Sequence, residues 1–273
     1  MDLEWYKIHE YLNLFFRWFH VIIGISWIGQ IYLFNWMERT LPLEIDTDAD
    51  ENISGQLWMV HGGGFYHVEK QKIPKIMPRT LHWFKWESAL TWISGLSLLI
   101  IVYYMGGLML EADSELTETA AGFMGAGILA IGYIVYYLLW KLPLGNNEII
   151  GSIFSFLLII AFFIGLDQVF SSRAAMMHIG AIFGTIMAAN VWLTILPAQR
   201  KMIASAEKRE PPDMSLAVKA KRCSKHNTYM SIPLILIMIS SHFPTTTYGN
   251  SDNWLFLGGY ILLGWIVAKW MRG

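Results

Sequence analysis

The sequence is poor in cysteine and in charge. Its single cysteine, Cys223, excludes an internal disulfide, a CxxC zinc or iron–sulfur site and CxxCH attachment of a haem. Charged residues make up only 15% of the 273 residues, and the net charge is -1. This balance indicates no nucleic-acid partner and no acidic substrate. The sequence also lacks a P-loop, a dinucleotide GxGxxG motif and a nucleophile motif, so it offers no signature of nucleotide binding or covalent hydrolysis.

Long apolar runs stand in place of these motifs. Hydrophobic residues reach 55% and the mean hydropathy is +0.41, which departs from the composition of a soluble domain. Runs near the roughly 20 residues that cross a bilayer core lie at about 13–37, 82–106, 120–140, 149–170, 174–196, 229–243 and 253–270. Lipid cannot satisfy open backbone groups, so each run should be a helix. We therefore predict an all-α, polytopic membrane helical bundle with about seven transmembrane helices and a single domain over 1–273.

The distribution of basic residues predicts the orientation. The segment from Arg200 to Lys225 is rich in Lys and Arg, whereas the loop at 107–118 contains four acidic residues and no basic one. Because cytoplasmic loops carry the excess of Lys and Arg, we place the N-terminus outside and the C-terminus in the cytoplasm. The cytoplasmic segments are then about 38–81 and 197–228, and the prolines of KREPPD predict a break between two helices in the second. Arg173 is the notable exception to the charge rule.

The histidines separate into two layers on this topology. His20, His178 and His242 fall at the outer level on three different predicted helices, while His82, His226, His61 and His67 fall at the inner level. Ionisable groups in a span are costly and are functional candidates by default.

Neutral imidazole binds haem iron, so two outer histidines on different helices are candidate axial ligands of a b-type haem (heme b). Gly24 near His20, and Gly180 and Gly184 near His178, would make room for the ring. The alternative is that Gly180 and Gly184 form a helix-packing face and the histidines bond across helices. A second haem held by His82 and His226 is a further possibility.

The inner layer suggests proton chemistry. LHWFKWESALTWISG (81–95) takes His82, Lys85 and Glu87 to the edge of an apolar run. Lys85 can snorkel to the headgroups, whereas Glu87 needs a partner in the bundle. It is a candidate proton acceptor or a structural counter-ion, with His82 and His67 as catalytic candidates beside it. The glycine triplet in HGGGFYHVEK (61–70) suits either close approach to a ligand or a hinge.

Five blocks of the sequence resemble a known family. They are FHVIIGISWIGQIYLFN (19–35), HGGGFYHVEKQ (61–71), LHWFKWESALTWISG (81–95), RAAMMHIGAIFGTIMAANVWLTILPAQ (173–199) and SKHNTYMSIPLILIMISSHFP (224–244). Together they resemble the integral-membrane N-terminal domain of the cytochrome-c-linked urate oxidase (urate dehydrogenase) family, in order over nearly the whole chain. The resemblance implies urate oxidation coupled to cytochrome c. This chain has no CxxCH, so we expect a separate cytochrome c or another respiratory-chain component as acceptor.

The function expected from these observations is a multi-pass enzyme of the bacterial inner (cytoplasmic) membrane. It would contain one or two b-type haems and pass electrons from a small reductant, urate or a related purine, to an external cytochrome c, with the lipid bilayer as its surroundings and no nucleic acid as partner. Three alternatives stay open: a quinol-linked cytochrome b, a cofactor-free membrane anchor subunit of a respiratory complex, and a transporter. Polar residues near mid-membrane also mark transport paths, but the sequence has neither an inverted repeat nor an acidic relay.

Overall fold

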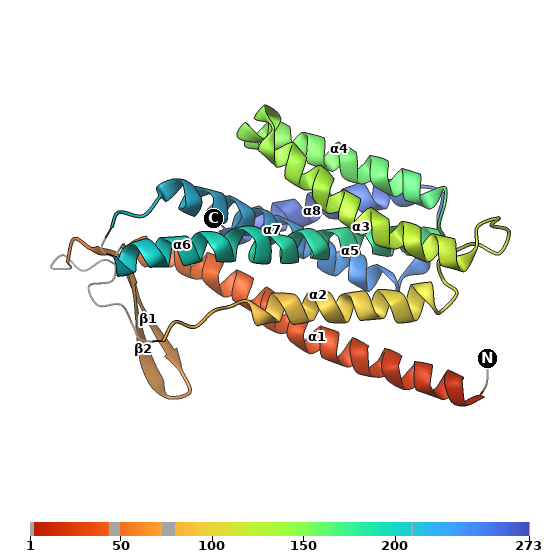
Figure 1. Ribbon diagram of the computed structural model, residues 1–273, viewed down its shortest axis with the longest axis horizontal. Helices are drawn as coiled ribbons and strands as arrows, with labels where there is room; N and C mark the ends of the chain where they lie inside the picture. The colour runs from red at the N-terminus through yellow and green to blue at the C-terminus, as the bar shows by residue number, and fades with distance from the viewer. Residues whose placement is uncertain (1–2, 44–49, 73–79, 209, 273) are drawn as a thin grey trace.

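A bundle of long helices with one β-hairpin at its end forms the protein (Figure 1). The structure is a computed structural model that describes residues 3–43, 50–72, 80–208 and 210–272. The helices are α1 (Leu3–Thr40), α2 (Trp86–Leu98), α3 (Glu118–Lys141), α4 (Glu148–Asp167), α5 (Ser172–Ala189), α6 (Leu196–Glu207), α7 (Met214–Ser240) and α8 (Asn253–Arg272). The hairpin consists of β1 (Ile53–His61) and β2 (Gly64–Gln71).

Six helical stretches of the described chain are long and apolar enough to cross a membrane: 4–40, 86–104, 118–141, 148–167, 172–207 and 253–272. They confirm the all-α membrane bundle and match six of the seven predicted spans. The seventh, predicted at 229–243, lies in the C-terminal half of α7. This helix begins at Met214, and its first half carries the basic residues, which is why α7 as a whole is less apolar. It nevertheless packs between α5 and α8 along the bundle.

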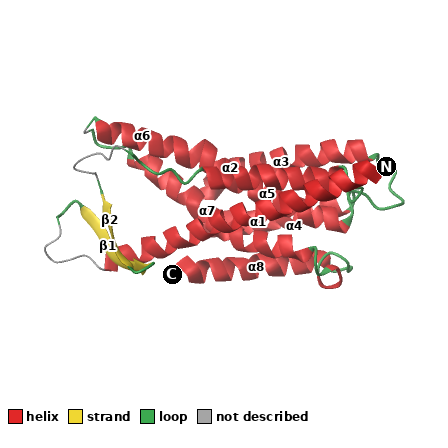
Figure 2. Ribbon diagram, turned by 90° about the horizontal axis from the view of Figure 1, so that it is seen from below, coloured by secondary structure: helices red, strands yellow, loops and turns green. Residues whose placement is uncertain are grey.

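The two ends of the bundle differ in charge. The N-terminus and the α2–α3 loop, with Glu111 and Asp113, lie at one end, while the hairpin, α6 and the C-terminus lie toward the other (Figures 1 and 2). The basic residues of 200–225 belong to α6, α7 and their connection at the hairpin end. This separation suits the predicted orientation, which stays a prediction. We refer below to the N-terminal end as the outer end and to the hairpin end as the inner end.

The glycine triplet closes the hairpin rather than forming an open loop or a hinge. His61 pairs with Gly64, and the two residues between them, Gly62 and Gly63, have φ angles of +59° and +80°. Two consecutive positive φ angles are those of a type I′ turn, for which glycine has no steric cost. At its other end the hairpin packs closely on the 3-10 turn Leu41–Leu43 that follows α1, where a Cβ at Gly55 would lie only 2.6 Å from Leu41 Cβ.

Two helices contain a π-helical segment. Leu99–Tyr104 continues α2, and Asn190–Ile195 joins α5 to α6 in one helix over residues 172–207. A π-bulge changes the direction of the following side chains and is frequent at functional sites. The carbonyl of Ile101 accepts a 2.8 Å hydrogen bond from His9 Nε2. This bond holds His9 of α1 against the bundle.

Side-chain caps begin several helices. Thr117, Asn147, Ser171 and Asp213 accept backbone N–H hydrogen bonds at the start of α3, α4, α5 and α7. Such caps satisfy the amide groups that a helix leaves free. The hydrogen bonds from Ser215 also lower the pKa of Asp213. The break predicted at KREPPD is confirmed, because α6 ends at Glu207 and α7 begins at Met214.

The packing of α7 against α8 generates a testable prediction. A Cβ at Gly264 would lie 2.6 Å from Pro233 Cδ, whereas a Cβ at Gly259, on the same helix, would meet nothing within 4 Å. Gly264→Ala should therefore force α8 away from the rigid proline ring and destabilise the protein by about 1–3 kcal/mol. The thermal unfolding midpoint in detergent should fall for Gly264→Ala and not for Gly259→Ala. Equal midpoints would show that the two helices are not in this close contact.

Candidate functional site

His178 is the most deeply buried of the histidines and lies near the outer end of α5. Its side chain has no solvent exposure. Nδ1 lies 2.7 Å from the carbonyl oxygen of Ala174, which only accepts, so Nδ1 carries the proton. Nε2 therefore has a free lone pair, and the hydroxyl of Tyr104 donates to it at 3.1 Å. Tyr104 is the last residue of the first π-helical segment, so the irregular turn supplies the partner of this histidine.

Gly125 of α3 makes room for this pair. A Cβ at this position would lie 2.6 Å from His178 Nε2 and 2.7 Å from the Tyr104 hydroxyl oxygen. The ring of Phe170 packs on the other side, with its centroid 5.2 Å from that of His178. His178 is thus enclosed by α3, the π segment and its own helix.

His20 of α1 has a different surrounding. It is partly buried, and its Nδ1 lies 2.9 Å from Ser94 Oγ. The single proton of the Ser94 hydroxyl is within reach of the carbonyls of Leu90 and Thr91, at 2.7 and 3.0 Å. When it is donated to either carbonyl, the hydroxyl oxygen accepts the Nδ1 proton of His20. The tautomer that follows has an unprotonated Nε2. A Cβ at Gly95 would lie 3.0 Å from His20 Cε1, which shows how closely the ring rests on α2.

The predicted outer layer is not a single layer in the structure. His20 contacts Ser94 and Gly95, whereas His178 contacts Tyr104, about ten residues further along the same continuous helix. At α-helical rise this is on the order of 15 Å along the bundle. His242 is exposed in the turn after α7, and no side-chain hydrogen bond or ring contact between described residues joins it to His20 or His178. The structure therefore does not bring the three histidines together.

The glycines predicted to make room for a haem have separate contacts. A Cβ at Gly180 would lie 2.6 Å from Met238 and 2.9 Å from Ile237, so Gly180 serves helix packing against α7. At Gly184 a Cβ would meet nothing within 4 Å, and at Gly24 it would be in ordinary contact with Thr91. Only the packing alternative is thus observed for Gly180.

The inner candidates are spread over three places. His82 is exposed in the segment before α2, which begins at Trp86, so it does not open that helix; its ring packs on Phe84. His67 lies on the exposed face of the hairpin and stacks on Trp58. Glu87 is in the first turn of α2, and its Oε2 is buried with no hydrogen-bond partner among the described residues. No hydrogen bond or ion pair between described residues joins His67 or His82 to Glu87.

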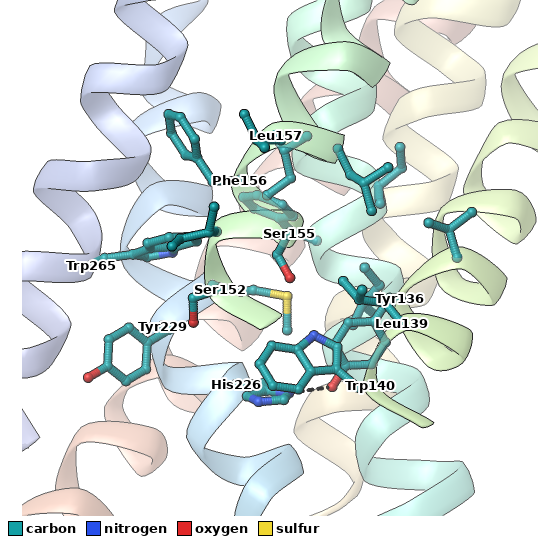
Figure 3. Close-up of a pocket in the computed structure, with 18 of the residues that line it drawn as sticks. Tyr136, Leu139, Trp140, Ser152, Ser155, Phe156, Leu157, His226, Tyr229 and Trp265 are labelled. Carbon is teal, nitrogen blue, oxygen red and sulfur yellow. Dashed lines mark hydrogen bonds between the residues drawn. The ribbon is translucent and has the colours of Figure 1, made fainter. Parts of the chain in front are cut away.

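His226 lies in the middle of α7 and faces a cavity of the inner half of the bundle (Figure 3). Its Nδ1 lies 2.8 Å from the hydroxyl of Tyr136, and its ring centroid lies 4.1 Å from that of Trp140. His82 is not among the residues that line this cavity. The pairing of His82 with His226 around a second haem therefore has no support in the geometry.

The sequence interpretation missed a polar pocket at the outer end. It has a volume of about 490 Å³ and is lined by Glu111, Asp167, Ser172, Arg173, Tyr248, Gly249, Asn250, Ser251 and Asn253. Asp167 Oδ2 accepts a hydrogen bond from Asn253, whereas Asp167 Oδ1 and Arg173 Nε are buried and have no partner in the described part of the chain. The one sequence signal for this pocket was Arg173, the basic residue on the acidic side.

Opposite charges that line one pocket without pairing are unusual. Asp167 and Arg173 make no ion pair with each other, and the guanidinium of Arg173 lies instead over the ring of Tyr103, 5.9 Å from its centroid. A buried charged atom without a partner costs free energy, and natural structures retain few of them. The pocket can offer the guanidinium of Arg173 and the unpartnered carboxylate oxygen of Asp167 to one small polar ligand.

Comparison with known families decides the relationship. The family model described as urate oxidase N-terminal matches residues 6–272. The chain belongs to the urate oxidase N-terminal family. No curated protein and no solved structure matches the chain. Membership confirms the resemblance found in the sequence and associates this family member with urate-related oxidoreductases, and its six apolar helical stretches mark it as a membrane protein.

The contact between His178 and α3 can be tested by adding one methyl group. Gly125→Ala should displace His178 or Tyr104 and cost about 1–3 kcal/mol, because neither ring can yield within the packed interior. Gly127→Ala is the matched control on the same helix, since a Cβ there meets nothing within 4 Å. After a heat step, size-exclusion chromatography should recover less Gly125→Ala protein than wild type and as much Gly127→Ala protein. Full recovery of both variants would contradict the close approach.

Proposed function

We propose that this family member is a b-type haem oxidoreductase of the bacterial inner membrane that oxidises urate or a related purine and passes the electrons to a cytochrome c at the outer end. Family membership supports the urate-related part. The observation that carries the haem assignment is the hydrogen bonding of His20, which holds its ring through Nδ1 and leaves Nε2 unprotonated.

The donor chemistry of the histidines discriminates between the candidate ligands. A haem ligand needs a nitrogen lone pair, with the other ring nitrogen donating to a fixed acceptor. His20 meets both conditions through Ser94. His178 has the same tautomer, but the Tyr104 hydroxyl and the α3 backbone at Gly125 occupy the space in front of its Nε2. His178 therefore does not fit as a ligand in this conformation, and we assign one haem, held by His20.

The outer pocket is the proposed substrate site. Urate is a flat ring with alternating N–H donors and carbonyl acceptors and carries an anionic charge at neutral pH. Arg173 would bind the anionic carbonyl edge, because guanidinium groups form charge-assisted hydrogen bonds to oxygens. Asp167 would accept a ring N–H and the proton that this nitrogen loses on oxidation. A bound haem would accept the electrons one at a time. Glu87 then has no direct part in substrate binding.

The charge of the outer end suits the proposed acceptor. The α2–α3 loop and the start of α3 carry Glu111, Asp113, Glu115 and Glu118. Complementary charge steers a partner to a surface and orients it there. A cytochrome with a basic face would thus be drawn to the end of the bundle where the substrate pocket lies.

The haem assignment predicts a spectrum that depends on His20. Detergent-purified protein should give a b-type reduced-minus-oxidised spectrum, and a pyridine haemochrome assay should give one haem per chain. His20→Ala should lose this haem, because no other side chain would replace its Nε2. His67→Ala, which alters an exposed histidine of the hairpin, should keep it. Folded wild-type protein with a flat spectrum, or haem retained in His20→Ala, would overturn the assignment.

The substrate site predicts a selective effect on KM. Arg173→Gln should raise the KM for urate about tenfold or more, since a hydrogen bond to a charged group contributes about 1.5–3 kcal/mol. The haem spectrum should not change. Arg200→Gln, at an exposed position of α6 at the inner end, is the control and should leave KM as it is. Steady-state reduction of cytochrome c by urate measures both variants, and an unchanged KM in Arg173→Gln would place the substrate elsewhere.

A further inference from the structure

A second cavity lies at the opposite end of the bundle and has a different character. It has a volume of about 630 Å³ and is lined by residues of α3, α4, α5, α7 and α8 (Figure 3). Its walls are mostly aliphatic and aromatic, with Trp140, Phe156 and Trp265 among them. His226 and Tyr136 meet at one end. Ser152 and Ser155 also line the cavity, but their hydroxyls donate to carbonyls of their own helix. An apolar cavity with a few polar groups is the usual form of a small-molecule site.

A chain of hydrogen bonds determines which nitrogen of His226 carries the proton. The side-chain amide of Asn227 donates to the backbone carbonyl of Met187 at 3.0 Å, which orients Asn227 and turns its oxygen to Asn190. The amide of Asn190 must then donate to Asn227, at 2.9 Å, and also to the hydroxyl of Tyr136, at 3.0 Å. Asn190 is the first residue of the second π-helical segment.

The proton of Tyr136 completes the chain. Its oxygen accepts from Asn190, which leaves its O–H for Nδ1 of His226, at 2.8 Å, or for the thiol of Cys223. Sulfur is the weaker acceptor, so the O–H donates to the imidazole. Neutral His226 then carries its proton on Nε2. Nε2 makes no hydrogen bond to a described residue, and it is not among their fully buried unpartnered atoms. His226 therefore presents an N–H donor at the cavity wall, which is the wrong state for an iron ligand and the right one for binding a carbonyl oxygen.

We propose that this cavity binds the ring of a lipid-soluble quinone, with one quinone carbonyl accepting the hydrogen bond from His226 Nε2. The aromatic walls pack on the flat ring, and the aliphatic residues of α4 and α5, such as Ile153 and Ile182, contact its apolar tail. A purine suits the cavity poorly, because it carries several donors and acceptors that these walls leave unpaired. An acyl chain alone would leave the donor of His226 unused.

The charged residues that line the cavity are compatible with a quinone as its ligand. Lys225 and Glu148 form an ion pair with each other, 2.5 Å apart, and so are already satisfied. Lys269 also lines the cavity. The quinone site is independent of the proposed function, since it uses neither His20 nor the outer pocket.

Photo-crosslinking tests the site directly. The protein in lipid nanodiscs is illuminated with a short-tailed azidoquinone, and the labelled peptides are identified by mass spectrometry. We expect label in the cavity segments of α3, α4 or α7, competed by unlabelled quinone and not by oleate. His226→Phe keeps a flat ring and removes the donor, so labelling at the same probe concentration should fall about tenfold, the loss expected from one neutral hydrogen bond near 1.4 kcal/mol.

The controls separate the possible outcomes. Tyr133→Phe removes a hydroxyl from α3 one turn from Tyr136, outside the cavity lining, and should label as wild type does. If His226→Phe does not fold, Tyr136→Phe supplies the test, because His226 loses the partner that sets its tautomer and labelling should fall several-fold. Competition by oleate would show an acyl-chain site, and label elsewhere or equal label in all variants would overturn the proposal. None of these readings requires haem or urate turnover.

Discussion

The absence of water in the bilayer core is the constraint on which the rest of this structure depends. A buried polar group of the backbone or a side chain costs free energy unless it has a partner inside the protein. For most of the chain the α-helix provides these partners, which is why the apolar runs are helical. The two π-helical segments interrupt this regularity, and each forms hydrogen bonds with polar side chains of other helices. In the first segment, the carbonyl of Ile101 accepts a hydrogen bond from His9 of α1. Asn190 of the second joins Tyr136 and Asn227.

The same constraint determines the chemistry of the histidines. In water a neutral imidazole exchanges between its two tautomers, whereas a buried ring is held in one by the partners around it. Ser94 leaves His20 with a free lone pair on Nε2, and Tyr136 leaves His226 with a proton there. One residue type thus becomes a potential metal ligand in one place and a hydrogen-bond donor in another. The difference lies in a serine and a tyrosine hydroxyl, each of which has its own partners.

The two cavities suit two kinds of small molecule. The outer pocket is polar, contains Asp167 and Arg173, and lies at the acidic end of the bundle. The inner cavity is mostly apolar, with His226 at one end. The proposals divide accordingly: a polar purine is bound and oxidised at the outer end, where a cytochrome can approach, and a quinone is bound within the membrane. His178 lies on α5 between the two, enclosed by Phe170 and Tyr104, and contributes to the packing that separates them.

The sequence alone was enough to predict the membrane bundle and the family, because both depend on properties that are local in the chain. Hydrophobic length predicts a span, the prolines of KREPPD predict a break, and a run such as 173–199 identifies relatives. Depth and pairing could not be predicted in this way. His20 and His178 were assigned to one level by counting residues from the predicted helix ends, and α1 proved to begin about ten residues before its predicted start. The tautomer of His226 depends on Tyr136, Asn190 and Asn227, which come from three helical segments. Asp167 and Arg173 become candidate ligand-binding residues only because they line one pocket together with the loop before α8. A hydrogen bond or a cavity wall is a relation between segments distant in sequence, so only the packing of the helices decided these features.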